Sequence, residues 1–567
     1  MTTDLARLSV WNALLASVAD EMGITLGRTG HSPNIRERRD YSCAVFDRDG
    51  ATVAQAAHIP VHLGAMPEAV RAVAALAPWN PGDIAIVNDP YLGGTHLPDV
   101  SLVAPVFFGG ELVAFLSNRA HHADIGGMAP GSMPVATELY QEGMIIPPLR
   151  LYDAGRLNEE LFAIILRNVR TPEERRGDFA AQIGSIRTGE RRLLNLFERY
   201  GADEVFERMA DLQAYAERLT RAAISAIPDG GYEAEDVLES PDGTFIPIRA
   251  RVTVGGDSIT VDFTGSAPAQ AASLNAVRAV TASAVSYCVR CLLPDDAPSN
   301  EGCFRPIRLV LPANSIVNAD PPHAVSAGNV ETSQRIGDVV FRALALALPG
   351  RIPAASSGSM NNFTFGGTRP DGSPFAYYET IPGGAGGGPV HRGESGIQTH
   401  MTNTANTPVE ALESVFPIRV HRFDLLDGSG GAGGGPVHRG ESGIQTHMTN
   451  TANTPVEALE TVFPIRVHRF DLRDGSGGAG RHGGGDGVIK EVEFLVDAGI
   501  TVISERRQAQ PYGLEGGSAG QTGANSLVHA DGEVEPIPAK VERRISGGTR
   551  VRIETPGGGG WGTPPGS

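Results

Sequence analysis

Two short polar segments contain residue types that bind metal ions. The first ends in His96-Leu97-Pro98-Asp99, and the second contains His121, His122 and Asp124. Imidazole nitrogens and carboxylate oxygens are the usual ligands of Zn, Mn and Fe(II). Two histidines and one aspartate would leave coordination positions open, as a catalytic metal requires. These residue types therefore permit a hydrolytic metal centre.

A β-hairpin is expected to bring the two segments together. Apolar runs at residues 101–108 and 111–116 flank Gly109-Gly110. Glycines suit the positive φ angles of a two-residue hairpin turn. Pro105 interrupts the first run, which predicts a sheet edge or a β-bulge beside it.

The turn also predicts which residues face each other. If Phe108 faces Glu111, Asp99 lies opposite Ala120 and Pro98 opposite His121, with His96 close by. The alternative is a polar, solvated hairpin base whose histidines share no ion.

Further polar residues near these segments are candidates for catalysis or substrate binding. His122 or Asp124 could act as a base or orient a metal ligand. His58 and His62 are separated by Pro60, which argues against a helical pair. These two histidines could bind substrate in the same pocket, although a structural loop is the interpretation that the pattern favours.

A charged run and the glycine-rich segments are less specific signals. Residues 36–40, Arg-Glu-Arg-Arg-Asp, could bind an anionic substrate, but such runs favour a salt-bridged surface. Glycine-rich segments could cradle a ligand through backbone N–H groups. Flexible connection is their default interpretation, and residues 557–562 resemble a tail.

Composition excludes several functions. The net charge is −18 and Lys490 and Lys540 are the only lysines, so the sequence has no phosphate-binding loop ending in Lys-Ser/Thr and no basic cluster typical of nucleic-acid binding. No apolar run reaches the length of a membrane helix. The N-terminal segment lacks the pattern of a signal peptide, and a cytoplasmic location is expected.

The alternation of helix-like and strand-like patterns predicts an α+β fold, a large mixed helix/sheet subunit. The hairpin-borne metal site is expected in its N-terminal half, and its C-terminal half is glycine-rich. Provisional lobes comprise residues 1–228, 229–354 and 355–563. Helices are expected at residues 4–22, 68–76, 158–227, 274–293 and 332–348. Within the third of these, Thr171 is expected to cap a helix that starts at Pro172.

The glycine-rich part contains a tandem duplication. Residues 384–430 and 431–477 are identical except at Ser414/Thr461 and Leu426/Arg473. Two near-identical copies are not a diverged solenoid, which needs roughly three or more units. One copy is therefore expected to fill the site in the fold, and the other to loop out.

Several motifs together resemble the hydantoinase B/5-oxoprolinase family over residues 4–563. They are residues 22–26 with 32–38, residues 54–64, residues 88–99, His121-His122-Ala123-Asp124, residues 329–334 and residues 403–410. In the carboxylase relatives of this family, a His-x-x-Asp pair and a later histidine hold a divalent metal. The resemblance places those ligands at His96, Asp99 and His121.

The resemblance also implies a function. Such a subunit works in a hetero-oligomer with a hydantoinase A-type subunit that binds ATP. The partner would phosphorylate a small cyclic amide, and this chain, with Zn, Mn or Fe, would hydrolyse the activated ring. Two alternatives stay open, namely a subunit of an ATP-dependent ketone carboxylase and a non-catalytic subunit that a metal stabilises.

Overall fold

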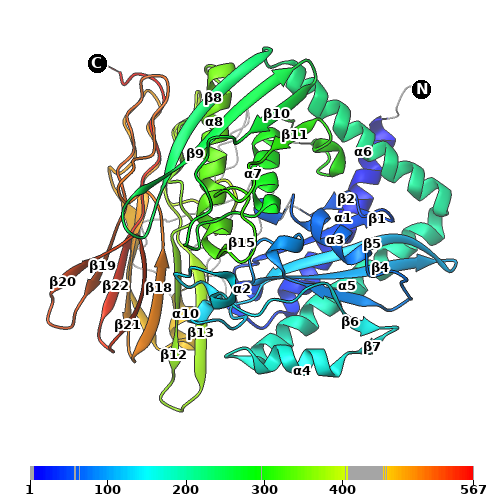
Figure 1. Cartoon of the computed structure of the whole chain (residues 1–567), viewed down its shortest axis with the longest axis horizontal. Coiled ribbons are helices and arrows are strands. Elements are labelled where there is room, and N and C mark those ends of the chain that lie inside the picture. The colour runs from blue at the N-terminus through cyan, green and yellow to red at the C-terminus, as the bar shows by residue number, and fades with distance from the viewer. Residues whose placement is uncertain are drawn as a thin grey trace, which may run out of the picture.

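The computed structural model describes residues 5–56, 59–62, 64–294, 296–402, 404–405, 451–452, 454 and 456–565. Helices and several separate β-sheets are mixed along the chain, which confirms the predicted α+β class (Figure 1). Among the described helices, none combines the length and the apolar character needed to cross a bilayer.

The N-terminal part is built on a seven-stranded sheet in the order β2-β1-β5-β4-β3-β6-β7. Its strands are β1 (Tyr41–Asp47), β2 (Thr52–Gln55), β3 (Ile84–Val87), β4 (Asp99–Phe108), β5 (Glu111–His121), β6 (Leu149–Asp153) and β7 (Arg156–Leu157). Helices α1 (Leu5–Thr29) and α5 (Pro172–Tyr200) pack on one face, and α3 (Met66–Ala74) packs on the other. The remaining elements of this part are α2 (Pro33–Arg36), α4 (Glu159–Arg167), α6 (Ala202–Ser225), η1 (Pro60–His62), η2 (Pro90–Leu92), η3 (Pro130–Ser132) and η4 (Leu139–Gln141).

Alternation along the strands divides the side chains between the two faces of this sheet. Leu116 on β5 joins the core beneath α1 and α5, whereas Phe115 joins the core beneath α3. Burying a side chain of this size contributes roughly 1.5–3 kcal/mol. Since successive residues face opposite sides, His121 lies on the side of Phe115 and His122 on the side of α5.

The central part of the chain contains a four-stranded sheet and two buried helices. The sheet order is β11-β10-β9-β8, with β8 (Gly230–Glu239), β9 (Phe245–Gly255), β10 (Ser258–Asp262) and β11 (Ile307–Val310). Helix α8 (Ser333–Ala347) packs on this sheet and against α7 (Arg278–Arg290), and a π-helical turn, η6 (Gly328–Thr332), leads into α8. A short 3-10 helix, η5, spans Glu301–Cys303.

Two sheets of the C-terminal part pack face to face around an aromatic core. One has the order β13-β12-β18-β21 and the other β16-β17-β22-β19-β20. Phe365 of the first sheet lies 5.2 Å from Phe494 of the second, between ring centroids. The elements are β12 (Asn362–Thr368), β13 (Pro374–Thr380), β14 (Thr404–Ala405), β15 (Thr451–Ala452), α10 (Val456–Val462), β16 (Ile465–Arg473), β17 (Gly487–Phe494), β18 (Ala498–Ile503), β19 (Ala524–Val528), β20 (Val534–Ile537), β21 (Lys540–Ile545) and β22 (Arg550–Glu554).

The glycine-rich segments form a closely packed bundle, and the expectation of flexible connections is wrong. Residues 383–397, 476–486, 511–521 and 556–562, which we call the glycine bundle, are joined by backbone hydrogen bonds. Gly558 N–H, for example, donates to Gly485 O at 2.9 Å. A Cβ atom on Gly558 would lie only 1.9 Å from the carbonyl oxygen of Ala385. Residues 557–560 are buried, so this segment is part of the folded structure and not a tail.

The duplicated segment contributes one half from each copy. Residues 384–397 of the first copy lie in the glycine bundle, and residues 456–477 of the second copy form α10, β16 and the following turn. Thr404–Ala405 pairs in parallel with Thr451–Ala452, which is the same position in the other copy. Because the copies are nearly identical, the fold can begin on one and end on the other. This differs from the expectation that one whole copy fills the site; residues 406–450 lie outside the described residues.

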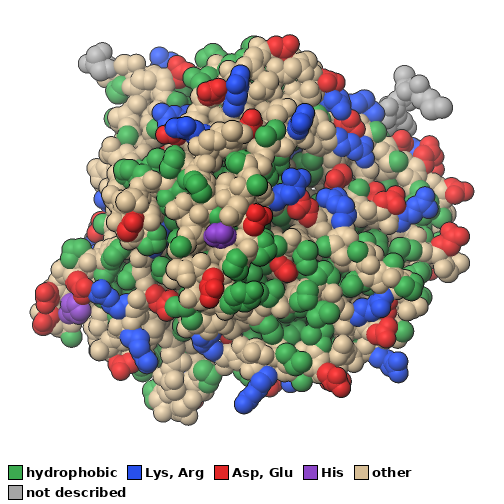
Figure 2. Space-filling model, in the orientation of Figure 1, with side chains coloured by type: hydrophobic (Ala, Val, Ile, Leu, Met, Phe, Trp, Pro, Cys, Tyr) green, Lys and Arg blue, Asp and Glu red, His purple; other side chains and the backbone are tan. Residues whose placement is uncertain are grey.

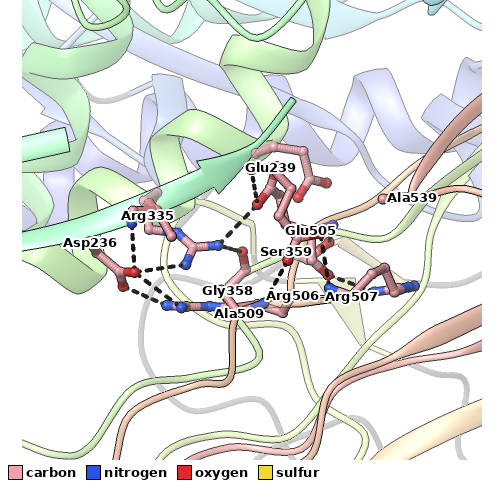
Figure 3. Close-up of polar contacts among 12 residues, drawn as sticks. Asp236, Glu239, Arg335, Gly358, Ser359, Glu505, Arg506, Arg507, Ala509 and Ala539 are labelled. Carbon is pink, nitrogen blue, oxygen red and sulfur yellow. Dashed lines mark hydrogen bonds and ion pairs between the residues drawn. The ribbon is translucent and has the colours of Figure 1, made fainter. Parts of the chain in front are cut away.

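A buried charge network connects the central part to the C-terminal sheets (Figure 3). Arg506 donates to Asp236 at 2.7 Å and to Asp338 at 3.1 Å, and Arg335 lies 3.4 Å from Glu505. These side chains are all at least nine-tenths buried. A buried ion left without its partner costs about 3–5 kcal/mol, so this network fixes the contact between the two parts.

Two local expectations from the sequence were wrong. Helix α5 starts at Pro172 as predicted, but Thr171 makes no capping hydrogen bond through its side chain. Arg38 of the charged run is fully buried, where it donates to Tyr378 O at 3.2 Å and to Thr380 Oγ1 at 3.0 Å. The neighbouring Arg36 is exposed as expected. On the face that Figure 2 shows, described acidic and basic side chains are interspersed.

Candidate metal centre

The β4–β5 hairpin places Asp99 directly opposite His121. Gly109 and Gly110 form the turn with φ angles of 61° and 86°, as the sequence predicts. The pairing then shifts by one residue at a β-bulge between Val106 and Phe107. The predicted register, with Asp99 opposite Ala120, is therefore wrong by one position.

This bulge decides which side chains share a face. A one-residue shift in the pairing changes which side chains of the two strands lie on the same face of the sheet. With the bulge, Asp99 and His121 lie on the same face, next to the pair formed by Ser101 and Arg119. The bulge follows Pro105 by one residue, beyond the part of β4 that pairs with β3. Its position agrees with the signal that Pro105 gave.

Three atoms that could bind a metal ion converge at the base of this hairpin. His96 Nε2 lies 3.0 Å from Asp99 Oδ1, His121 Nδ1 lies 3.1 Å from the same oxygen, and the two nitrogens are 3.2 Å apart. All three residues are at least 98% buried. Metal bonds of about 2.1 Å separate neighbouring ligand atoms by about 3.0–3.4 Å. The three atoms therefore have the spacing that one divalent cation requires.

Neighbouring groups fix the orientation of these ligands. Thr95 Oγ1 donates to Asp99 Oδ2, and His62 Nε2 lies 3.4 Å from that oxygen, so Oδ1 is the oxygen that faces His96 and His121. His96 Nδ1 lies 3.4 Å from Ser326 O. A carbonyl oxygen only accepts, so Nδ1 carries the proton and Nε2 presents its lone pair.

The charge states of Asp99 and His121 also suit a metal ion. Burial lowers the pKa of His121, which keeps its imidazole neutral at pH 7. Burial acts to raise the pKa of Asp99, but the histidines around it outweigh that effect and hold this pKa well below its usual range. An ionised carboxylate and a neutral imidazole are the forms of these two side chains that bind a divalent cation.

Of the two histidines proposed for substrate binding, the structure describes one. His62, on η1, is buried, and its Nδ1 lies 2.6 Å from Ser42 Oγ on β1. Its other ring nitrogen faces Asp99, so His62 belongs to the centre. His58 lies outside the described residues.

The two residues proposed for catalysis, His122 and Asp124, make their hydrogen bonds away from the candidate metal ligands. His122 Nε2 lies 2.9 Å from Gln182 Oε1 on α5, and its ring packs on Phe179. Burial lowers the pKa of His122 to about 4. Asp124 accepts two hydrogen bonds from Arg170, each of 2.7 Å. These contacts hold the segment after β5 against α5 and the loop around Arg170.

Sequence patterns missed several residues that surround the centre. Asn329 Nδ2, from η6, lies 3.1 Å from His96 Nε2. The ring of Tyr378 on β13 stacks on His121, with the ring centroids 4.3 Å apart, and the Arg38 guanidinium lies 5.0 Å from the centroid of the Tyr378 ring. Glu142 accepts from the backbone N–H of Val325 and Ser326, and burial raises its pKa to about 7. The motifs at residues 32–38 and 329–334 were the sequence signals near this group.

The amino-acid sequence matches the family model of hydantoinase B/oxoprolinase at residues 4–434 and 429–564. The chain therefore belongs to the hydantoinase B/oxoprolinase family, as its motifs predicted.

Several relatives of known sequence are similar over nearly the whole chain. An uncharacterised protein of Methanocaldococcus jannaschii is 38% identical over 99% of this chain and 91% of its own length. 5-Oxoprolinase 1 of Arabidopsis thaliana is 36% identical, but the chain spans only 42% of that protein. A Pseudomonas protein that is named as the B-type subunit of a D-/L-hydantoinase is 30% identical, with 97% of this chain and 88% of that one covered.

Two solved structures have the same fold. The ATP-dependent caprolactamase of Pseudomonas jessenii matches with a TM-score of 0.82 and 28% identity, over 99% of this chain and 92% of that chain. An acetone carboxylase structure matches with a TM-score of 0.83, over 99% of this chain and 76% of that one. At 16% identity, the second match shows the fold alone.

Proposed function

We propose that this family member is the metal-binding subunit of an ATP-dependent cyclic amidase. It would act in the cytoplasm, in a hetero-oligomer with a hydantoinase A-type subunit that binds ATP. The substrate would be a lactam or hydantoin. The observation that carries the proposal is the convergence of His96, Asp99 and His121 on one buried point. The names of relatives that act on cyclic amides support the choice of substrate class.

The need for ATP follows from the chemistry of the substrate. An unstrained lactam or imide is a poor electrophile, and closure of its ring is favourable. Phosphorylation of the carbonyl oxygen by the partner would make the carbonyl carbon electrophilic enough for water to attack. Departure of the ring nitrogen would then break the C–N bond and open the ring, and a second water would release phosphate from the resulting acyl phosphate. This division of work agrees with a sequence that has no Gly-rich loop ending in Lys-Ser/Thr.

The residues of this chain would hold and orient the reacting groups. His96 Nε2, Asp99 Oδ1 and His121 Nδ1 would bind a divalent Zn, Mn or Fe ion, which supplies activation of water and stabilisation of negative charge. Thr95 and His62 keep the second oxygen of Asp99 occupied. Burial of the ligands excludes bulk water, which strengthens electrostatic interactions at the centre.

The proposed roles of the remaining residues follow their positions. His62 lies beside Asp99 and stays a candidate for contact with substrate. His122 and Asp124 are better suited to position β5 and the loop after it than to act on substrate, because both are held by neighbouring side chains. The role of His58 stays a prediction.

The proposal can be tested on the chain purified together with its A-type partner. ATP-dependent ring opening of 5-oxoproline, hydantoins and caprolactam is expected, together with one divalent ion per chain. His121→Ala should remove both the ion and the activity, whereas the control His529→Ala, at a side chain that pairs with Glu535, should change neither. Bicarbonate-dependent turnover of a ketone, with no turnover of any cyclic amide, would replace the amidase with a carboxylase.

The same variant tests the non-catalytic alternative. Loss of the ion and of activity with an unchanged melting temperature supports catalysis. Loss of folding on removal of His121 would support a metal that only stabilises the structure.

A further inference from the structure

Asn329 projects into the metal centre from a locally distorted helix. It lies in the π-helical turn η6, and such turns are common at functional sites. The backbone there is fixed, because a Cβ on Gly328 would lie 1.9 Å from Asn275 O and Ser333 Oγ donates to Asn329 O at 2.6 Å. The Asn329 side chain is 4% exposed. Its amide therefore has a defined and buried position.

The hydrogen bonds around His96 Nε2 conflict with the present orientation of this amide. Three atoms lie within 3.2 Å of that nitrogen, namely Asp99 Oδ1, His121 Nδ1 and Asn329 Nδ2. A ring nitrogen has a single lone pair or a single proton to share. If Nε2 binds a cation, Asn329 Nδ2 has no acceptor there.

The oxygen of the same amide lacks a hydrogen-bond donor in the described part of the chain. Asn329 Oδ1 is buried and has no hydrogen-bond partner among the described residues. The nitrogen and the oxygen of a side-chain amide exchange places on a half-turn, and their assignment follows from the surrounding hydrogen bonds. After such a turn, the oxygen lies about 3.1 Å from His96 Nε2. This is the separation that the three other ligand atoms already show.

We propose that Asn329 is a fourth ligand of the metal ion, through its amide oxygen. The centre then offers two imidazole nitrogens, one carboxylate oxygen and one neutral oxygen. An added oxygen ligand makes the site more suitable for hard ions such as Mn²⁺. The inference rests on the proposed metal centre, but it concerns ion binding by this chain and not the reaction.

Metal titration of the full chain tests this proposal. The protein is stripped with a chelator and titrated with Mn²⁺, Zn²⁺ or Co²⁺ alone, in competition with a chromophoric chelator. Asn329→Leu removes the oxygen and should weaken binding by about 10-fold or more. Its visible Co²⁺ spectrum should intensify as the coordination number falls. The half-buried Asn318, which donates to Pro312 O, provides a matched Asn318→Leu control that should bind as the parent does.

A second variant distinguishes a ligand from a hydrogen-bond donor. Asn329→Asp keeps the shape and an oxygen but cannot donate to His96, so it should bind the ion at least as tightly as the parent. Weaker binding by Asn329→Asp, or binding by Asn329→Leu within about 2-fold of the parent with the same Co²⁺ spectrum, would overturn the proposal. If Asn329→Leu does not fold, the affinity of Asn329→Asp decides. Neither result depends on turnover, so the amidase proposal can fail or succeed separately.

Discussion

The candidate metal centre and the glycine bundle depend on opposite features of the amino-acid sequence. At the centre, the identity of each side chain matters, and three polar groups meet within 3.2 Å. In the bundle, the absence of side chains matters, because carbonyl oxygens occupy the places of Cβ atoms. A substitution at the centre should therefore change chemistry and leave the fold intact. A substitution in the bundle should prevent the backbone from packing at all.

The largest effect is expected in the bundle. Gly558→Ala places a methyl group 1.9 Å from the backbone oxygen of Ala385, which no side-chain movement can relieve. The free energy of unfolding should fall by more than about 4 kcal/mol. Denaturant unfolding measures this change, or loss of soluble protein reports it.

A glycine outside the bundle is the control for this variant. Gly184 lies within α5, and a Cβ there would meet nothing within 4 Å. Gly184→Ala should stabilise the protein by roughly 0.5–1 kcal/mol. If Gly558→Ala were as stable as the parent, the glycine bundle would not depend on the absence of side chains, and its contrast with the metal centre would be lost.

At the metal centre, the largest effect should be on ion binding. Asp99→Ala removes the oxygen to which both histidines point, and the affinity for a divalent ion should fall by more than about 100-fold. The far-UV circular dichroism should not change, since the hairpin is held by its backbone pairing. Retention of the ion by this variant would contradict the assignment of the ligands.

A smaller effect is expected from Glu142, beside the centre. Burial raises its pKa from an ordinary 4.5 to about 7 in the folded protein. The folded state then binds more protons than the unfolded state between these values. Its contribution to stability is present below about pH 4.5 and is lost as the pH rises to about 7, by about 3 kcal/mol.

Glu142→Gln tests this titration in the metal-free protein. Glutamine keeps an oxygen that accepts from Val325 and Ser326, but it does not ionise. Its free energy of unfolding should match that of the parent near pH 4 and exceed it near pH 8. Parallel pH profiles for the two proteins would show that Glu142 does not titrate in this window.

The smallest effect concerns the duplication. Deletion of residues 404–450 or of residues 431–477 leaves a single copy of the repeat in each case. The first deletion keeps Arg473, which donates to Thr522 O at 2.6 Å and lies 3.4 Å from Glu554. The second deletion leaves Leu426 at the corresponding place.

Thermal unfolding of the two deletion proteins makes this comparison. Both should fold, and the protein that keeps Arg473 should be more stable by about 1–2 kcal/mol, since a hydrogen bond to a charged group contributes that much. Failure of the first deletion to fold would show that residues 404–450 are needed for the fold and that one copy of the repeat is not sufficient.

Local sequence patterns predict the hairpin of the candidate metal centre better than they predict the glycine bundle. The turn at Gly109-Gly110 and the closeness of Asp99 to His121 were predictable, because the two strands are close in sequence and follow period-2 patterns. The choice of these residues and His96 as metal ligands came from the resemblance to the family and stays a prediction. The pairing was wrong by one residue, since a bulge leaves little trace in such a pattern. Asn329 lies more than two hundred residues after the hairpin, and local spacing gives no information on its place.

The bundle and the buried charges were not predictable from local patterns. Glycine runs have no hydrophobic period, so nothing in them indicates which backbone segments lie side by side. Arg38 was assigned to the surface because charge runs usually lie there. Its partner Tyr378 is distant in sequence, and only the folded chain brings the two together. The division into lobes at residues 228 and 354 stays a prediction.

The central claim is that one cation is shared by the three residues at the base of the hairpin. An anomalous difference map from crystals of the metal-loaded protein, recorded at the absorption edge of the bound ion, tests this claim directly. We expect a single peak within bonding distance of His96 Nε2, Asp99 Oδ1 and His121 Nδ1. A peak at another place, or these side chains binding no common ion at saturating metal, would contradict it.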